Sequence, residues 1–491
     1  MSSILTNNSA MVALQTLKSV NMSMTETQSQ ISTGKRVANA KDNSAVWAIS
    51  KVMESDVKGF KSISESLSLG ESTVAVARNA SETVTDLLTQ MKGKIIGAQE
   101  SNVDRNKLQT DIEAFSGQIK SVVTAAQFNG LNLLQGTEDV DVLSSLDRAN
   151  SGAVSSSSIS VTRQDLSYDA GVYNASGTDL SANATASAAA VVNTAITETL
   201  TLATAQSIGD VLRLQIGEET VAYTATDTTL NNAAAGLTAA INAAGIEGIS
   251  AVAAGAGITL SSTIAFEDTA LAYTSTGGTT GTYSGDAALE ARAETVTFSA
   301  TAGVNEGDGY RLTIGSQDFD YVAGKNETFE DVANGLKIAI DGAGLADIST
   351  NVTTNASGQF VLQVDNDGTT LAFAVDARSD GTATGGLAGL DDIDVTTDEG
   401  AAAALSNIET YIDTAIDSAA SFGSVQGRIE TQASFITKLT DSLKSGIGSL
   451  VDANMEETSA RLQALQVQQQ LAVQAMSIAN QAPQSLLSLF R

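Results

Sequence analysis

Few residue types in this sequence could perform chemistry. Its 491 residues include no His and no Cys, which excludes thiol nucleophiles, Ser/His/Asp arrangements and metal sites with His ligands. A hydrolase built from carboxylates alone would need a convergent pair of Asp or Glu side chains, and no such pair stands out. We therefore expect no enzyme activity, no cofactor, and no catalytic or metal-binding residue.

Two short motifs begin like ligand-binding loops without completing them. Gly34 and Lys35 are followed by Arg36, and Ser29 stands where a phosphate loop needs its first glycine, so that pattern fails. Residues 365–368, Asp-Asn-Asp-Gly, start like a calcium loop. A polar Asp-Gly pair between two apolar runs is more typical of a hairpin turn. We interpret the second motif as such a turn and assign no ligand to the first.

Charge is distributed unevenly along the chain. There are 26 basic and 56 acidic residues, for a net charge of -30, which disfavours nucleic acid and anionic membranes as partners. Residues 151–400 hold 7 of the basic and 32 of the acidic residues. This acidic middle should face water, and the nearly neutral ends can pack against one another.

Both ends of the chain show a seven-residue apolar repeat, which predicts helices with a seam for a partner helix. At the N-terminus the repeat consists of Ala10, Leu17, Met24, Ile31 and Ala38. Residues 462–490 contain no charged residue, and Leu465, Ala472 and Ala479 keep the same spacing there. We expect the first helix to end near Thr33, because Gly34 follows, and to pair with the C-terminal one.

Longer seams inside these ends predict helices over 42–98, 104–127 and 401–450. The residues that should form this core seam are Phe60, Leu67, Val74, Leu88, Phe115, Phe422, Ile429, Ile436 and Leu443. The pattern breaks at 33–43 and at 451–455, so each end should join a short outer helix to a long inner one. The predicted fold class is mainly α at both termini, with long antiparallel coiled-coil helices and an inserted α+β, β-rich middle, in an elongated multi-domain subunit.

The middle of the chain contains an internal repeat. Residues 209–217 match residues 307–315, and the similarity continues downstream at an offset of about one hundred residues. Each copy is typical of a hairpin, a short helix and a second hairpin, with Thr229 and Thr328 as helix caps. We predict two outer modules, 197–292 and 293–396, after a Ser/Ala-rich lead-in over 151–196.

The uncharged C-terminal helix points to self-assembly. A helix without charge on any face is expected to be covered all round, and one partner helix cannot do this. Other copies of the same chain must therefore contribute, and repeated head-to-tail packing gives a helical filament. The predicted assembly interface consists of Leu14, Leu17, Met24, Ile31, Leu462, Leu465, Leu471, Met476 and Ile478. Both ends should be largely unfolded before assembly.

Three motifs at the two ends resemble those of bacterial flagellins. They are Gln-Ile-Ser-Thr-Gly-Lys-Arg-Val at 30–37 with Ala-Lys-Asp at 40–42, Gln-Phe-Asn-Gly at 127–130, and Ser-Ile-Ala-Asn-Gln at 477–481 followed by Pro483. The resemblance covers about 1–150 and 401–491. It implies a self-assembling structural subunit of the flagellar filament, used for swimming motility and exported unfolded through a type III apparatus. No signal peptide is expected, and the location implied is the extracellular filament.

The resemblance also implies domains and partners. Residues 1–38 with 455–491 would form an inner terminal-helix domain, and 39–150 with 401–454 a long-helix bundle with a hairpin near 128–150. Implied partners are other flagellin copies, hook-associated junction and cap proteins, and a cytoplasmic export chaperone. A hook-filament junction protein and a surface-displayed glycan-binding filament protein are the alternatives.

Three positions depart from the flagellin pattern at a site that many flagellins present to the vertebrate flagellin-sensing Toll-like receptor. The usual Arg is Gln90, a usual Glu is Gly93, and Asn454 replaces the second Asp of an Asp-Ala-Asp motif. We predict a degenerate receptor site, and therefore weak activation of cells that bear this receptor by the purified monomer.

Overall fold

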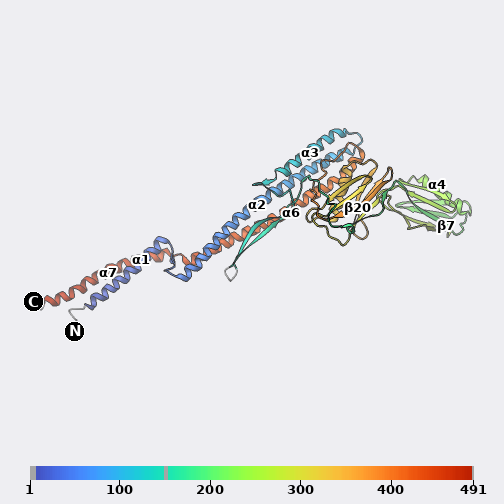
Figure 1. The fold of residues 1–491 in the computed structure, drawn as a ribbon. Helices are drawn as coiled ribbons and strands as arrows, with labels where there is room; N and C mark the ends of the chain where they lie inside the picture. Colours follow the sequence, from blue (N-terminus) through green and yellow to red (C-terminus); the bar gives the residue numbers. More distant parts are fainter. Residues whose placement is uncertain (1–6, 149–152, 489–491) are drawn as a thin grey trace. The chain divides into compact units, whose positions relative to one another are not determined.

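The computed structural model describes residues 7–148 and 153–488, and the chain divides into two compact units (Figure 1). Unit 1 comprises residues 1–72, 140–161 and 424–491, and unit 2 comprises residues 73–139 and 162–423. The predicted helical ends and β-rich middle are confirmed. Among the described residues, no helix has both the length and the apolarity that a membrane span requires.

Unit 1 consists of helices and one hairpin. The terminal helices α1 (Asn8–Thr33) and α7 (Met455–Ser488) lie side by side (Figure 1). The predicted end of α1 is confirmed, because Gly34 follows Thr33 in the left-handed conformation, with φ 68°. The unit also holds the first part of α2 (Ser44–Ala98), the last part of α6 (Asp398–Val451), and the hairpin of β3 (Val140–Arg148) and β4 (Val154–Val161).

The β3–β4 hairpin packs on α2 where two helical glycines leave room for it. A Cβ on Gly59 would lie 2.6 Å from Leu146 Cδ1, and one on Gly70 would lie 2.6 Å from Val142 Cγ1. Gln432 Nε2 of α6 donates to the Ser144 carbonyl at 2.9 Å. The sequence analysis places residues 154–161 in a Ser/Ala-rich lead-in, whereas in the structure they form a strand that pairs with β3. The sequence did not indicate this strand, because it is rich in Ser and has no clear apolar alternation.

Unit 2 begins with the rest of α2, followed by α3 (Arg105–Ala125) and a tight hairpin of β1 (Gln127–Phe128) and β2 (Leu131–Asn132). The predicted turn is confirmed, since Asn129 and Gly130 both have positive φ, 51° and 84°. In the seam between α2 and α6, Ser81 interrupts the apolar repeat. Its hydroxyl lies 3.0 Å from that of Ser418, and both serines are buried. This polar pair satisfies both hydroxyls inside the seam.

The rest of unit 2 contains two modules with the same plan, each with a helix and two four-stranded sheets (Figure 1). The elements of the first module are β7 (Ile196–Ala203), β8 (Val211–Ile216), β9 (Glu219–Thr224), α4 (Leu230–Ala244), β10 (Ile249–Ala254), β11 (Gly257–Ser262), β12 (Thr269–Ser275), β13 (Thr280–Tyr283) and β14 (Ala288–Leu289). Those of the second are β15 (Glu294–Phe298), β16 (Gly309–Ile314), β17 (Gln317–Val322), α5 (Phe329–Gly342), β18 (Ile348–Thr354), β19 (Phe360–Asn366) and β20 (Leu371–Arg378). The predicted order of hairpin, helix and hairpin is confirmed in both.

Two strands from the lead-in segment complete the second module. β5 (Ala184–Ala186), preceded by the short helix η1 (Ser181–Asn183), pairs with β15, and β6 (Ala190–Val191) pairs with β20. In the first module the equivalent places are taken by β13 and β14, which come last in that module. The second module is thus a circular permutation of the first, and the first is inserted within it. The sequence-based division at residue 196 differs from this pairing, because contacts across about a hundred residues leave no local signal.

The Asp-Asn-Asp-Gly segment at 365–368 is not a hairpin turn. It joins β19, in the sheet of order β18-β19-β15-β5, to β20, in the sheet of order β17-β16-β20-β6. The prediction of a hairpin is therefore wrong. The segment crosses from one sheet to the other, a change that the turn residues themselves do not determine, because Asp-Gly suits many turns.

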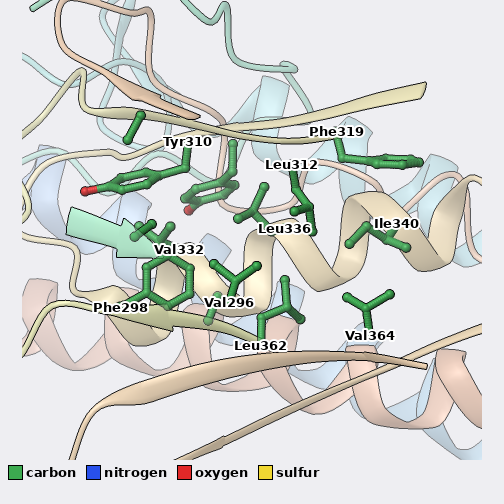
Figure 2. Packing of buried hydrophobic residues seen from close by; sticks show 14 of the residues in the cluster. Val296, Phe298, Tyr310, Leu312, Phe319, Val332, Leu336, Ile340, Leu362 and Val364 are labelled. Atoms are coloured by element: carbon green, nitrogen blue, oxygen red, sulfur yellow. The ribbon is translucent and has the colours of Figure 1, made fainter. Parts of the chain in front are cut away.

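The core of the second module lies between its two sheets and α5 (Figure 2). Val332, Leu336 and Ile340 of α5 meet side chains of β15, β16 and β19 there (Figure 2). Phe298 stacks on Phe329, with ring centroids 5.6 Å apart. The predicted capping box of α5 is present at Thr328, whereas Thr229 makes no side-chain cap bond to α4.

A helical glycine in each module lies under a tyrosine ring. A Cβ on Gly335 would lie 2.2 Å from Cδ2 and Cε2 of Tyr321, and the equivalent Gly236 has the same relation to Tyr223. We expect Gly335→Ala to lower the unfolding free energy of unit 2 by about 2 kcal/mol, because the tyrosine must move. Urea unfolding followed by tyrosine fluorescence measures this. Gly303→Ala, where a Cβ would meet nothing within 4 Å, is the control, and equal midpoints for the two variants would contradict the prediction.

Candidate functional site

Polar contacts at two levels join the pair of terminal helices, and a third joins the segment after α1 to the end of α6. Asn7 Nδ2 donates to the Ala479 carbonyl at 2.9 Å. Further along, Gln469 Nε2 donates to Asn21 Oδ1 at 2.8 Å. Beyond the end of α1, Arg36 donates a side-chain hydrogen bond to the carbonyl of Leu450, in the last turn of α6, at 2.9 Å.

The segments that join the short helices to the long ones also pair with each other. Arg36 N donates to the Val451 carbonyl at 2.6 Å, and Ala453 N donates to the Gly34 carbonyl at 3.0 Å. These backbone bonds bring the two sequence breaks, at 33–43 and 451–455, to one place in unit 1. Contacts between these two joining segments thus help to position α1 and α7, in addition to the contacts between the helices themselves.

Little of the helix pair is buried. Thr27 is the one buried residue of α1, and Thr458 and Ala472 are the buried residues of α7 within 455–481. Of the predicted interface residues, Leu17, Met24, Ile31, Leu462, Leu465 and Met476 are half-buried. Leu14, Leu471 and Ile478 are exposed, the last at 69%. The structure therefore divides the predicted interface between a seam inside the pair and a face that points to solvent.

The solvent-facing side of the pair carries a set of exposed large apolar side chains, which we call the outer apolar set. Its members are Met11, Val12, Leu14, Met22, Met455, Val467, Leu471, Val473 and Ile478. Charge is scarce beside them: Lys18 and Glu26 are the charged residues of α1, and α7 has none after Arg461. An extended apolar surface with few charges is typical of a protein–protein contact.

All but one of the core-seam residues lie in the long helices α2 and α6, and Phe115 lies in α3. Phe60, Leu67, Val74, Leu88, Phe422, Ile429 and Ile436 are buried, while Phe115 and Leu443 are half-buried. The long helices thus have filled interiors, in contrast to α1 and α7. Exposed apolar side chains also occur on the long helices of unit 1, for example Ile49 and Leu69 of α2 and Phe435 of α6.

The three residues of the predicted receptor site lie on the surface. Gln90 and Gly93 are exposed on α2 within unit 2, and a Cβ on Gly93 would meet nothing within 4 Å. Asn454 lies in unit 1, where its Oδ1 accepts from Glu456 N at 3.2 Å at the start of α7. Weak receptor activation stays a prediction.

A polar cavity of about 670 Å³ lies in unit 2, next to α5 and α6. Its lining includes the carboxylates of Asp165, Glu327, Asp331 and Asp413, with Lys325 as one of its few cations. Glu327 Oε2 accepts from Tyr321 Oη and from Gly324 N, both at 2.9 Å. Burial nevertheless raises the pKa of Glu327 to about 7.

The acidic segment at 365–368 is occupied by an arginine. Arg292 Nε donates to Asp365 Oδ1 at 2.7 Å, and the same guanidinium reaches Asp367 Oδ1 at 2.6 Å. Within residues 7–148 and 153–488, no group of three or more acidic side chains is arranged to hold a metal ion. The carboxylates of this segment therefore serve an ion pair in the fold.

Sequence reasoning did not find the polar residues that set the register of the terminal helices. Gln469 belongs to a Gln-rich stretch, and single amides such as Asn7 and Asn21 give no periodic signal. In the sequence, Arg36 stands out only as the residue at which the phosphate-loop pattern fails. A search for polar side chains at the ends of an apolar repeat could have suggested them.

Comparisons with known proteins identify relatives over the whole chain. Residues 4–139 match the bacterial flagellin N-terminal helical region, and residues 405–490 match the bacterial flagellin C-terminal helical region. Flagellin A of Rhizobium meliloti is 32% identical over 497 residues, covering 100% of both chains.

Two solved structures match this chain at low identity and low TM-score. Hook-associated protein 3 of Legionella pneumophila is 10% identical with a TM-score of 0.31, over 82% of this chain and 98% of the other. FliC of Burkholderia pseudomallei is 15% identical with a TM-score of 0.26, over 73% and 99% of the two chains.

Proposed function

The chain belongs to the bacterial flagellin family and is a structural subunit of the flagellar filament, and from this premise we propose that α1 and α7 carry its polymerisation. The two helices would form an antiparallel coiled coil within each subunit, as the seven-residue spacing predicts. Their remaining apolar surface would be buried against the same helices of other copies, gathered at a common axis. Head-to-tail contacts repeated without closure build a helical filament.

The observation that carries this proposal is the outer apolar set. Pairing of α1 with α7 leaves these side chains in water, although burial of one such side chain contributes about 1.5–3 kcal/mol. Leu14 of α1 and Leu471 of α7, both 57% exposed, illustrate that neither helix is covered by the other. Several copies around one axis would cover both, and a short helix pair would then gain the stability it lacks alone.

The family also supports partners at the ends of the filament. We propose contacts with other copies of this chain and with hook-associated junction proteins, as membership of the flagellin family implies. We further propose export in an unfolded state through a type III apparatus, a cytoplasmic chaperone that masks α7 before export, and a distal cap protein. The small number of buried residues in α1 and α7 supports this, because such helices cost little to unfold.

A junction protein is the less supported alternative. The match to Flagellin A of Rhizobium meliloti extends over 100% of both chains, which includes the variable middle. A junction protein would not grow long filaments alone, whereas this chain should do so in salt or on filament seeds.

A single charge in the outer apolar set tests the proposal. We expect Ile478→Asp to leave the helix content of the monomer unchanged and to raise the critical concentration for polymerisation at least tenfold, because the carboxylate would be buried against other copies. Sedimentation of filaments after seeding measures this. Ile208→Asp is the matched control, since Ile208 is 71% exposed but lies in the first outer module. Equal polymerisation of both variants would contradict the proposal.

A further inference from the structure

A buried group of three polar side chains joins the second module to α6. Lys337 and Asp341 lie one turn apart on α5, with side chains 6% and 7% exposed, and Asn407 on α6 is also buried. Lys337 Nζ lies 2.6 Å from Asn407 Oδ1 and 2.6 Å from Asp341 Oδ2. Asn407 Nδ2 donates to the same Asp341 oxygen at 3.1 Å. An amine, a carboxamide and a carboxylate are thus in mutual contact.

The first module shows that the shared fold does not require these residues. When the two modules are aligned through their repeat, Thr238 and Asn242 of α4 are equivalent to Lys337 and Asp341 of α5. Asn242 bonds the backbone of Ala251 through both its amide atoms, at 2.8 and 2.9 Å. The lysine and the aspartate therefore serve the contact with α6, which the first module does not make through these positions.

We propose that Lys337 and Asn407 form an intramolecular isopeptide bond, with Asp341 as the proton carrier. The amine is the nucleophile and the Asn407 side-chain carbonyl carbon is the electrophile. The contact of Nζ with the carbonyl oxygen holds the two reacting groups together, which lowers the entropic part of the barrier. Burial excludes water, the competing nucleophile for the amide.

The reaction balances without an oxidant or a co-reactant. Asp341 takes a proton from the Lys337 ammonium, and the neutral amine attacks Cγ of Asn407. A bond forms between Nζ and Cγ, and the carbonyl electrons move to Oδ1. Asp341 returns its proton to Nδ2 and takes one from Nζ, and the carbonyl re-forms as the bond from Cγ to Nδ2 breaks. The leaving group is ammonia. It takes the remaining proton from Asp341 and departs as ammonium, which returns Asp341 to its carboxylate form.

Asp341 is the poorer electrophile of the two candidates. Its Oδ1 accepts from Thr350 Oγ1 at 2.5 Å and its Oδ2 accepts from Lys337 and Asn407. Both oxygens are thus occupied by donors, and the carbon of a carboxylate resists attack by an amine. The structure therefore favours loss of ammonia from Asn407 over loss of water from Asp341.

The mass of the denatured full-length protein tests the proposal directly. We expect it to lie below the mass of the sequence by one ammonia. Complete tryptic digestion should give a branched peptide joining the segments around Lys337 and Asn407, without cleavage after Lys337. An unchanged mass with cleavage after Lys337 would overturn the proposal, and so would a loss of water.

Variants separate this bond from other sources of ammonia loss. Lys337→Thr and Asp341→Asn introduce the residues of the first module, so they should fold, and both should show the full sequence mass. Lys325→Arg is the control, because Lys325 lies in the same module but pairs with Asp139; it should keep the mass deficit. A succinimide formed at another Asn would persist in Lys337→Thr, and that result would refute the isopeptide bond.

Discussion

Deletion of residues 462–491 is expected to abolish polymerisation completely. The deletion removes most of α7, including Val467, Leu471, Val473 and Ile478 of the outer apolar set. It also removes the partner of α1, because the bonds from Asn7 to Ala479 and from Gln469 to Asn21 disappear. An isolated helix of the length of α1, 26 residues, with its diluted apolar content is marginal in water.

Two measurements check this expectation. Filament growth from the truncated chain should be absent in salt and on seeds, at concentrations where the full chain grows. Thermal unfolding of unit 2 should be unchanged, since the deletion lies in unit 1. Filaments formed by the truncated chain would refute the assignment of polymerisation to the terminal helices.

The second large effect concerns pH and Glu327. Burial raises the pKa of its carboxyl from 4.5 to about 7, and the nearby charges of Asp331 and Asp165 add to the rise. The bonds from Gly324 N and Tyr321 Oη act in the opposite direction. The folded state therefore binds this proton more tightly than the unfolded state does, so the group stabilises the fold at low pH.

The difference in pKa between the folded and unfolded states sets the sign and size of the contribution of Glu327 to the free energy of unfolding. The contribution is fully present below pH 4.5 and is lost as the pH rises through about 7. A rise of this size corresponds to about 3 kcal/mol. Glu327→Gln keeps an uncharged acceptor for Gly324 N and Tyr321 Oη, so the variant should match the wild type at pH 5 and be more stable than it at pH 8 by up to about 3 kcal/mol.

Urea unfolding of the whole chain at pH 5 and pH 8, followed by tyrosine fluorescence, measures the difference. Other carboxylates titrate in the same range, and for that reason the comparison is between variants at each pH. Glu330→Gln is the control, because Glu330 lines the same cavity but is exposed. If Glu327→Gln and the wild type keep the same stability difference at both pH values, Glu327 does not act as described.

Local patterns predicted the helices well for a physical reason. The seven-residue repeats through Leu17, Leu67 and Ile429 report one face of a helix, and a face is a property of a few consecutive turns. The glycine after Thr33 and the Asn-Gly pair at 129–130 likewise act through their own backbone angles. For the same reason, the sequence alone showed the repeat of the two modules, in which Tyr223 of the first is equivalent to Tyr321 of the second.

The candidate site was only partly predictable. The sequence placed Leu14 and Leu17 on one interface, but the two have different surroundings, since Leu17 is half-buried in the pair and Leu14 is exposed. Which side of a helix its nearest partner covers depends on the rotation of one helix about the other. Polar bonds such as that from Gln469 to Asn21 set this rotation, and they have no periodicity to detect.

By itself, the sequence determined the helical ends, the repeated order of hairpin, helix and hairpin in the middle, the exclusion of His- and Cys-based chemistry, and the resemblance to flagellins. Tertiary structure alone decided that β5 and β6 complete the second module, that residues 365–368 cross between sheets, and that Lys337 meets Asn407. The reason is that periodicity and turn chemistry act within a few residues of one another. Strand pairing, and the meeting of an amine on one helix with an amide on another, depend on contacts between residues far apart in the chain.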